Sequence, residues 1–390
     1  MSLNSIPAAE RLHISFFGRR NAGKSSLINA LTGQNLSIVS EEKGTTTDPV
    51  KKTMELLPLG AVVIIDTAGI DDEGELGKLR VEKTMQMLDI TDIAVVVTDG
   101  ETGIGKTEED LIEKLNAKKI PHIVCYNKSD ILPYIPLNAN EVSVSAISGE
   151  GIESLKELLG KFNTPKTAPL VADLIKPADT VVLVVPIDEA APKGRLILPQ
   201  QMVIRDILDN NGIAVTLQPE ELPVYLENVK KPPALLICDS QVFGKTAKLT
   251  PENIPLTSFS ILMLRYKLGL DAALKAADAL DELHDGDRIL VSEGCTHHRQ
   301  CGDIGTVKLP ALIKKYTGKD INFNFTSGCD FPADVSGYAM VIHCGGCMLS
   351  DKAVRARMIT AEGQNVPFTN YGIILSKIQG TLERSMEIFS

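Results

Sequence analysis

The sequence predicts an α/β fold built from three domains, and three observations support this expectation. Apolar stretches suited to strands alternate with helical stretches through residues 1–164, which is the pattern of a doubly wound parallel sheet. Prolines interrupt residues 163–179, and a smaller group of strands and helices follows over residues 175–260. The pattern changes again at residue 264, so residues 264–390 are expected to form a third α/β domain.

Length and composition limit the classes of protein to which the chain can belong. Its 390 residues exceed one compact core, and 44% hydrophobic residues suffice for packed domains. A formal net charge of −10 argues against a nucleic acid or an anionic membrane as the main partner. No apolar run approaches the ~20 residues that span a bilayer, and the amino terminus lacks the layout of a signal peptide. We therefore expect a cytoplasmic protein whose thiols stay reduced.

Five short apolar stretches are expected to form the strands of the first domain. They are residues 12–17, 61–65, 93–97, 123–126 and 141–144. In a parallel sheet the carboxyl ends of the strands meet at one edge, where ligands bind. Four of these stretches lead directly into recognisable motifs, which places the motifs at that edge.

The first motif is the glycine-rich stretch 18–25, GRRNAGKS, which fits the phosphate-binding pattern G-x-x-x-x-G-K-[ST] between a strand and the helix expected over 24–31. Gly18 and Gly23 let the backbone approach phosphate oxygens, and backbone N–H groups face the phosphates. Lys24 would reach the outer phosphates, and Ser25 would hold Mg²⁺. The predicted nucleotide-binding residues of this loop are Arg20, Asn21, Ala22, Gly23, Lys24, Ser25 and Ser26.

Two further motifs are expected to act on magnesium and the terminal phosphate. Thr46, in the stretch GTTTD, would complete magnesium coordination only while the γ-phosphate is bound, which makes its loop a switch. Asp66 begins the stretch DTAG and would hold magnesium through water, while the Gly69 N–H would bond the γ-phosphate. Lys24, Thr46 and Asp66 are therefore the predicted catalytic residues.

The stretch NKSD at 127–130 predicts which base is bound. The Asp130 carboxylate can accept hydrogen bonds from both the ring N–H and the exocyclic amine of guanine, whereas adenine offers no such pair. Asn127 and Lys128 belong to the same motif, and Ser145 and Ala146 follow the next strand and would close over the base. The motif predicts a guanine nucleotide.

This combination of motifs resembles the small GTPases of the branch that contains Era and TrmE. The resemblance covers the first domain and implies that GTP and Mg²⁺ bind there. It also implies that Asn21 binds a potassium ion beside the phosphates. Ile70 stands where Ras-like enzymes carry a water-orienting glutamine, so we expect slow hydrolysis unless a cation or another group assists. Glu75 is one candidate for that group.

The middle domain is expected to contain strands at 180–186, 213–217 and 234–238 and helices at 200–210 and 220–229. No catalytic cluster accompanies these elements. A domain with strong strands and no site chemistry commonly serves assembly, so residues 175–260 are predicted to be a dimerisation domain that forms a homodimer.

The third domain is expected to begin with an amphipathic helix over 264–283, followed by strands at 288–291, 321–325 and 339–342. Helices are expected at 351–362 and 381–389. Two of the strands lead into histidines and cysteines that suit metal ligation. These residues are Cys295, His297, His343, Cys344 and Cys347.

The spacing of these residues leaves three interpretations open. A C-x-x-C pair lets two thiolates meet one metal centre, and parallel strands could bring the two strand ends together. The ligands could build a closed structural zinc site, or three thiolates could hold an iron–sulfur cluster whose fourth iron has an exchangeable ligand. The third possibility is a set of core thiols without metal.

The GTPase motifs, the middle α/β domain and the C-x-H and H-C-x-x-C sequences together resemble the HydF family of FeFe-hydrogenase maturation GTPases over the whole chain. The resemblance implies a GTPase domain at 1–164 and an iron–sulfur cluster-binding domain at 264–390. It implies a 4Fe-4S cluster on Cys295, Cys344 and Cys347, with His297 and His343 either as ligands or beside them. It also implies a scaffold that receives a di-iron precursor from the radical-SAM maturases HydE and HydG and delivers it to apo FeFe-hydrogenase.

Two other functions remain as alternatives. The first is an Era-like GTPase associated with the ribosome or RNA, with a zinc-stabilised tail. The acidic charge and the lack of a basic, aromatic-bearing module weigh against it. The second is a redox carrier whose cluster shuttles electrons, and a substitutable fourth cluster ligand would contradict that function.

Overall fold

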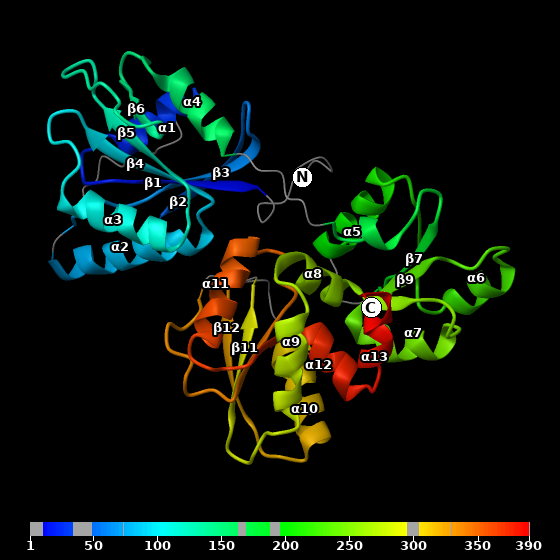
Figure 1. Cartoon of the computed structure of the whole chain (residues 1–390). Coiled ribbons are helices and arrows are strands. Elements are labelled where there is room, and N and C mark those ends of the chain that lie inside the picture. Colours follow the sequence, from blue (N-terminus) through cyan, green and yellow to red (C-terminus); the bar gives the residue numbers. More distant parts are fainter. Residues whose placement is uncertain are drawn as a thin grey trace. The chain divides into compact units, whose positions relative to one another are not determined.

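The computed structural model of the protein describes residues 11–33, 49–72, 74–162, 169–187, 196–294, 304–328 and 330–389. The chain divides into two compact units, residues 1–166 and 167–390 (Figure 1). The first unit contains a six-stranded sheet, and the second contains two four-stranded sheets. None of the helices in the described ranges combines the length and apolar character that crossing a bilayer requires.

The sheet of the first unit has the strand order β2-β3-β1-β4-β5-β6. All neighbouring strands pair in parallel except β2, which runs antiparallel to β3. The five predicted strands are confirmed within a residue or two at their ends. The bounds are β1 Leu12–Phe17, β2 Val50–Leu56, β3 Gly60–Asp66, β4 Ile93–Asp99, β5 His122–Asn127 and β6 Glu141–Ser143.

Helices cover both faces of this sheet (Figure 1). On one face, α1 (Lys24–Thr32) and α4 (Ile152–Lys161) bury apolar side chains such as Leu27 and Leu155 against the strands. On the other face, α3 (Lys106–Ala117) and the short turn after α2 (Gly74–Gln86) bury residues such as Leu88 and Leu111. The doubly wound arrangement is therefore confirmed.

The second unit contains two all-parallel sheets, ordered β10-β9-β7-β8 and β12-β11-β13-β14. The strands are β7 Thr180–Val184, β8 Ile213–Leu217, β9 Leu235–Cys238, β10 Leu256–Ser258, β11 Arg288–Glu293, β12 Asn322–Ser327, β13 Met340–His343 and β14 Phe368–Asn370. The helices are α5 Leu198–Asp209, α6 Leu222–Asn228, α7 Phe243–Leu249, α8 Phe259–Lys267, α9 Asp271–Ala277, α10 Leu309–Thr317, α11 Asp351–Glu362, α12 Tyr371–Ile378 and α13 Leu382–Met386.

The prediction of one helix over 264–283 is wrong. The structure has two helices, α8 and α9, and a short 3-10 turn at Asp278–Leu280. The break lies at Gly269, whose φ of +87° is a left-handed conformation that ends an α-helix and that glycine adopts without strain. The Ser258 side chain accepts a hydrogen bond from the Ile261 N–H and so caps α8, which begins at Phe259, five residues before the predicted helix start.

Helix α8 takes part in the cores of both sheets in the second unit. Phe259, Leu262 and Met263 pack in the core beneath the β10-β9-β7-β8 sheet. Ile261 and Leu264 pack in the core beneath the β12-β11-β13-β14 sheet. The helix is thus buried on several sides and connects the two sheets physically.

Candidate functional site

The phosphate loop is shaped by two glycines that cannot be replaced without a clash. A Cβ at Gly18 would lie 2.1 Å from the Val97 carbonyl oxygen, and one at Gly23 would lie 2.3 Å from the Asn127 Nδ2. Both glycines have positive φ angles, +153° and +87°. The loop therefore runs against β4 and the end of β5 at the carboxyl edge of the sheet, where ligands of such sheets bind.

Lys24 lies folded over this loop. Its Nζ donates hydrogen bonds to the Gly18 carbonyl at 2.9 Å and the Arg19 carbonyl at 2.8 Å. Burial lowers the pKa of Lys24, and the nearby carboxylates of Asp66, Asp71 and Asp72 oppose that shift. The ammonium group is thus fixed at the mouth of the loop, within an acidic surrounding.

Ser25 and Asp66 meet across the loop as the sequence predicts. The Ser25 hydroxyl donates to Asp66 Oδ2 at 2.6 Å. Asp66 Oδ1 is buried and has no hydrogen-bond partner among the described residues. Burial raises the pKa of Asp66, while the Ser25 hydrogen bond and the Lys24 charge counteract the rise. An orphaned carboxylate oxygen beside a hydroxyl fits Mg²⁺, which prefers oxygen ligands.

The segment after β3 lies against the phosphate loop. The Ile70 N–H donates to the Gly18 carbonyl at 3.3 Å, and the Arg20 N–H donates to Asp71 Oδ1 at 2.7 Å. A Cβ at Gly69 would lie 3.0 Å from the Arg20 nitrogen, so the two backbones are close. Ile70 is buried. Thr46 and the side chain of Glu75, the other predicted participants, lie outside the described parts of the structure.

Asn127 joins the phosphate loop to the base-binding loop. Its Nδ2 donates to the Ala22 carbonyl at 3.1 Å, and its Oδ1 accepts from the Ala146 N–H at 3.1 Å. The side chain is buried, so these bonds form away from water. Three of the predicted motifs are thus held together by one amide.

Asp130 and Ser145 also come together. The Ser145 hydroxyl donates to Asp130 Oδ1 at 2.5 Å and accepts from the Ser148 N–H at 3.1 Å. Lys128 has a φ of +64°, and its Nζ lies 3.2 Å from Asp99 Oδ2. Asn21 and Ser26, the remaining predicted residues of the phosphate loop, are exposed on the loop and at the start of α1.

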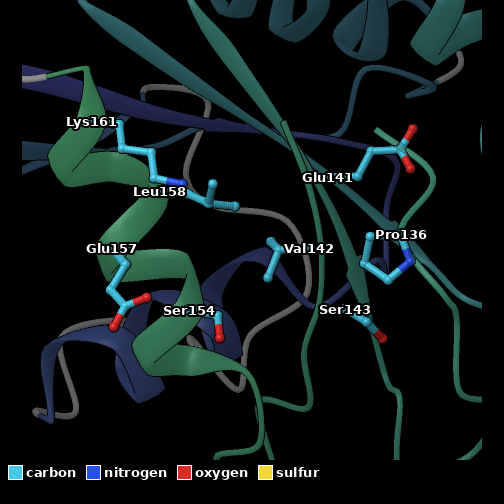
Figure 2. Close-up of a pocket in the computed structure, with 8 residues that line it drawn as sticks. All are labelled: Pro136, Glu141, Val142, Ser143, Ser154, Glu157, Leu158 and Lys161. Atoms are coloured by element: carbon cyan, nitrogen blue, oxygen red, sulfur yellow. The ribbon is translucent and has the colours of Figure 1, made fainter. Parts of the chain in front are cut away.

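A cavity of about 360 Å³ in the first unit is separate from these motifs (Figure 2). It lies between β6, all of whose residues line it, and α4, which contributes residues from Ser154 to Lys161. None of the predicted nucleotide-binding residues lines it. Its lining residues are Pro136, Glu141, Val142, Ser143, Ser154, Glu157, Leu158 and Lys161.

In the second unit, adjacent parallel strands bring together the chain segments that lead into the two cysteine sequences. Ser292 of β11 pairs with His343 of β13. Just beyond them, the Gly294 N–H donates to the Cys344 sulfur at 3.0 Å, and the Gly346 N–H donates to it at 3.3 Å. Cys295 follows Gly294 in the chain, but Cys295 and His297 lie outside the described residues. No group of three or more potential metal ligands occurs within the described part of the chain.

The two described cysteines of this motif are free thiols whose pKa values are raised. Burial raises the pKa of Cys344. Burial and the neighbouring Cys344 raise the pKa of Cys347 to about 11. A metal centre would have to displace both protons, and the backbone N–H groups already aimed at the Cys344 sulfur would then stabilise the thiolate. The donor set therefore fits a thiolate-bound centre.

His343 is engaged through both ring nitrogens. Its Nδ1 lies 2.6 Å from the Cys344 carbonyl oxygen, and its Nε2 lies 3.0 Å from Arg357 Nη1. Burial and the Arg357 charge lower its pKa to about 3, so the ring is neutral. The hydrogen bonds assign the proton to Nδ1, while Nε2 accepts from the guanidinium. In this arrangement His343 orients the cysteine loop and offers no vacant nitrogen to a metal.

Two buried cations at this site were not predicted from the sequence. Arg357 on α11 donates to the Ser292 hydroxyl and to the His343 ring. Lys267 at the end of α8 donates to two carbonyls of the cysteine loop. In the sequence, neither residue differs from a charged residue on an exposed helix surface. Ser292 is 65 residues from Arg357 along the chain, and Gly346 is 79 residues from Lys267.

The phosphate loop, the Ser25–Asp66 pair and the Asn127–Asp130 motif at one sheet edge define a GTPase domain, which binds GTP with Mg²⁺. A family model described as "50S ribosome-binding GTPase" matches residues 13–128. The models described as "Hydrogen maturase F dimerization domain" and "Hydrogen maturase F tetramerization domain" match residues 170–268 and 271–388. The chain therefore belongs to the hydrogen maturase F family of hydrogenase-maturation GTPases, as the resemblance to HydF implies.

The comparisons also found GTPases that are similar to part of this chain. The chain is 39% identical over 125 residues to the tRNA modification GTPase MnmE of Helicobacter pylori (strain Shi470), covering 32% of this chain and 28% of that protein. It is 32% identical over 156 residues to MnmE of Dechloromonas aromatica, covering 38% and 34%. The chain thus spans about a third of the length of these relatives. The Aquifex aeolicus Era structure covers 55% of this chain and 97% of its own at 20% identity and a TM-score of 0.33.

The family match also indicates self-association and argues against the ribosome- or RNA-associated function. Both models of the second unit describe oligomerization domains, so the chain carries modules for self-association. The sequence predicts a homodimer, so the tetramerization module at residues 271–388 was not expected. The ribosome- or RNA-associated alternative is not favoured, because residues 170–268 and 271–388 match hydrogen maturase modules.

Proposed function

We propose that this protein is a GTP-hydrolysing scaffold that assembles the di-iron subcluster precursor and delivers it to apo FeFe-hydrogenase in the cytoplasm. One observation carries the proposal: a GTPase domain is joined to hydrogen maturase modules in which Gly294 contacts the Cys344 sulfur. That contact joins the two strand ends that carry the cysteine motif. The radical-SAM maturases HydE and HydG would supply the precursor.

In the GTPase domain, Ser25, Asp66 and Thr46 are the proposed magnesium ligands, with Asp66 acting through water. The bound Mg²⁺ neutralises negative charge on the phosphates during transfer. Lys24 would leave the Gly18 and Arg19 carbonyls and bind the outer phosphates, and the Gly69 N–H would bind the γ-phosphate. Asp130, with Asn127, Lys128, Ser145 and Ala146 around it, would bind the guanine.

The proposed hydrolysis is slow. Ile70 is buried and apolar, so it cannot orient the attacking water. A potassium ion bound by Asn21 would supply charge beside the phosphates instead. The exposed position of Asn21 on the phosphate loop leaves its side chain accessible for that role.

In the second unit, Cys295, Cys344 and Cys347 are the proposed ligands of a 4Fe-4S cluster, with His297 as a further candidate. Three thiolates on a four-iron cluster would leave one iron without a cysteine ligand, at which a guest metal unit would attach. His343 holds the Cys344 carbonyl, and the Gly294 and Gly346 N–H groups donate to the Cys344 sulfur. The dimerization and tetramerization modules would present several such sites in one oligomer.

Activation of purified apo FeFe-hydrogenase, in the presence of the two radical-SAM maturases, tests this proposal. Wild-type protein should activate the hydrogenase, and Cys344→Ser should not. Cys238→Ala is the matched control, because Cys238 is a buried thiol in β9 outside the motif, and it should activate as wild type does. Equal activation by Cys344→Ser and wild type would overturn the scaffold proposal.

A further inference from the structure

Lys267 is a buried lysine that contacts the cysteine loop. It is the last residue of α8 and is only 4% exposed. Its Nζ donates to the Gly346 carbonyl at 3.0 Å and to the Leu349 carbonyl at 2.6 Å, and it lies 3.5 Å from Asp351 Oδ1. The two carbonyls accept hydrogen bonds from the ammonium group, and the Asp351 carboxylate lies at ion-pair distance from it, which suits a positively charged side chain.

The contacts of Lys267 lie within the segment that carries the two cysteines. Gly346 stands between Cys344 and Cys347, and Leu349 follows two residues after Cys347. Gly346 has a φ of +63°, and a Cβ there would lie 2.9 Å from Val354, so this turn is tightly packed. The lysine therefore holds both ends of the loop that presents Cys347.

The same lysine lies where the two sheets of the second unit meet. Cys344 packs against the core beneath the β12-β11-β13-β14 sheet, whereas Cys347 packs against the core beneath the β10-β9-β7-β8 sheet. The Lys267 carbonyl accepts from Arg355 Nη2 of α11 at 2.8 Å, which fixes the end of α8 to the helix after the loop. The backbone and the ammonium group of Lys267 are thus both held by hydrogen bonds, so the positive charge has a fixed position beside the cysteine loop.

We propose that Lys267 is a positioning residue that fixes the loop of Cys344 and Cys347 and raises the reduction potential of the iron–sulfur cluster bound there. The inference rests on the proposed function, since it needs the cluster. Reduction adds one electron to the cluster, and a fixed positive charge nearby stabilises the more negative state. Burial strengthens this effect because water screens the charge less.

The test is an anaerobic redox titration of the reconstituted full-length protein, followed by electron paramagnetic resonance of the reduced cluster. Lys267→Met should lower the potential, because it removes the positive charge. Asp351→Asn should raise the potential, because it removes a negative charge beside the same lysine and keeps the side-chain shape. Lys275→Met, which removes an exposed lysine from α9, is the control and should leave the potential at the wild-type value.

We expect Lys267→Met and Asp351→Asn each to change the equilibrium constant for cluster reduction about tenfold, which corresponds to about 59 mV for a one-electron couple. Opposite shifts in Lys267→Met and Asp351→Asn cannot come from loop packing alone, so they report the charge. Potentials equal to wild type in both variants, with the cluster present, would overturn the inference. If Lys267→Met does not retain the cluster, the near-isosteric Asp351→Asn variant still shows in which direction a change of charge at this position shifts the reduction potential.

The metal-free protein provides a second readout of the positioning role. In the apo form, Lys267→Met should speed alkylation of Cys344, because the loop loses two hydrogen bonds, whereas Lys275→Met should not. Mass spectrometry of the labelled peptide measures the rate, and an unchanged rate in Lys267→Met would refute the positioning role. Failure of wild-type protein to bind any cluster would instead refute the proposed function, so the two failures are distinguishable.

Discussion

Asp130 is the residue on which the proposed base specificity depends. Its Oδ1 accepts the Ser145 hydroxyl, and Ser145 in turn accepts the Ser148 N–H, so the carboxylate is held by the loop that would close over the base. A carboxylate held in this way is already oriented, so it loses little rotational freedom when its other oxygen binds a ligand. A positioned acceptor discriminates more steeply than a mobile one, because less ordering accompanies binding.

The variant Asp130→Asn tests this role. The amide cannot accept both guanine N–H groups, so affinity for GTP should fall by about 10- to 100-fold, while affinity for xanthosine triphosphate should rise. Equilibrium binding of both nucleotides to wild type and variant measures the exchange of preference. Retained preference for GTP in the variant would show that Asp130 does not read the base.

Asn21 is expected to provide the cation dependence of hydrolysis. Ile70 offers no polar group at its position, so a bound potassium ion is the proposed source of assistance. Wild-type turnover should be faster in potassium than in sodium at equal ionic strength, and Asn21→Ala should remove that difference. Steady-state phosphate release measures both. Equal turnover of wild type in the two salts would exclude a potassium role.

At the scale of elements, Gly269 decides how α8 ends. A Cβ at this position would meet no atom within 4 Å, so replacing Gly269 tests the backbone conformation alone. Gly269→Ala forces a φ of +87° on an L-residue and should cost roughly 1–2 kcal/mol of folding free energy. Thermal unfolding should show a lower Tm, whereas Gly337→Ala, which has no positive φ, should unfold like wild type. An unchanged Tm in Gly269→Ala would mean that α8 and α9 can merge.

The elements that sequence reasoning found are those with strong local signals. The apolar strands of the first sheet and the glycine loop are visible because their residues are contiguous. Strand β2 was not found, because its sequence VKKTMEL is half polar and mostly exposed or half-exposed at the sheet edge. Helix α12 was not found, because its sequence YGIILSKI is short, mostly apolar and mostly buried, and such a stretch does not distinguish a helix from a buried strand.

The site residues also differ in whether a local sequence signal reveals them. The motif residues could be named in advance, and the pairing of Ser25 with Asp66 and of Asp130 with Ser145 follows from strand order. Lys267 and Arg357 could not be named, because their roles depend on contacts that only the tertiary fold creates. Lys267 is 79 residues from Gly346 in the chain.

At the scale of the whole molecule, the proposed nucleotide and cluster residues belong to different compact units, residues 1–166 and 167–390. Lys24→Ala removes the phosphate-binding cation of the first unit and leaves the second unit unchanged. GTP turnover should fall at least a hundredfold, while iron bound per chain after reconstitution should equal that of wild type. Phosphate release and iron analysis measure the two quantities. A joint loss of turnover and iron would contradict independent sites.

The central claim is that one chain combines a GTPase with a thiolate-bound iron–sulfur cluster, and iron and acid-labile sulfide per chain after anaerobic reconstitution test it most directly. Wild-type protein should contain both elements and absorb in the visible range, while Cys344→Ser should lose most of its iron and still hydrolyse GTP. Wild-type protein that binds zinc and no iron, or equal iron in both proteins, would contradict the claim.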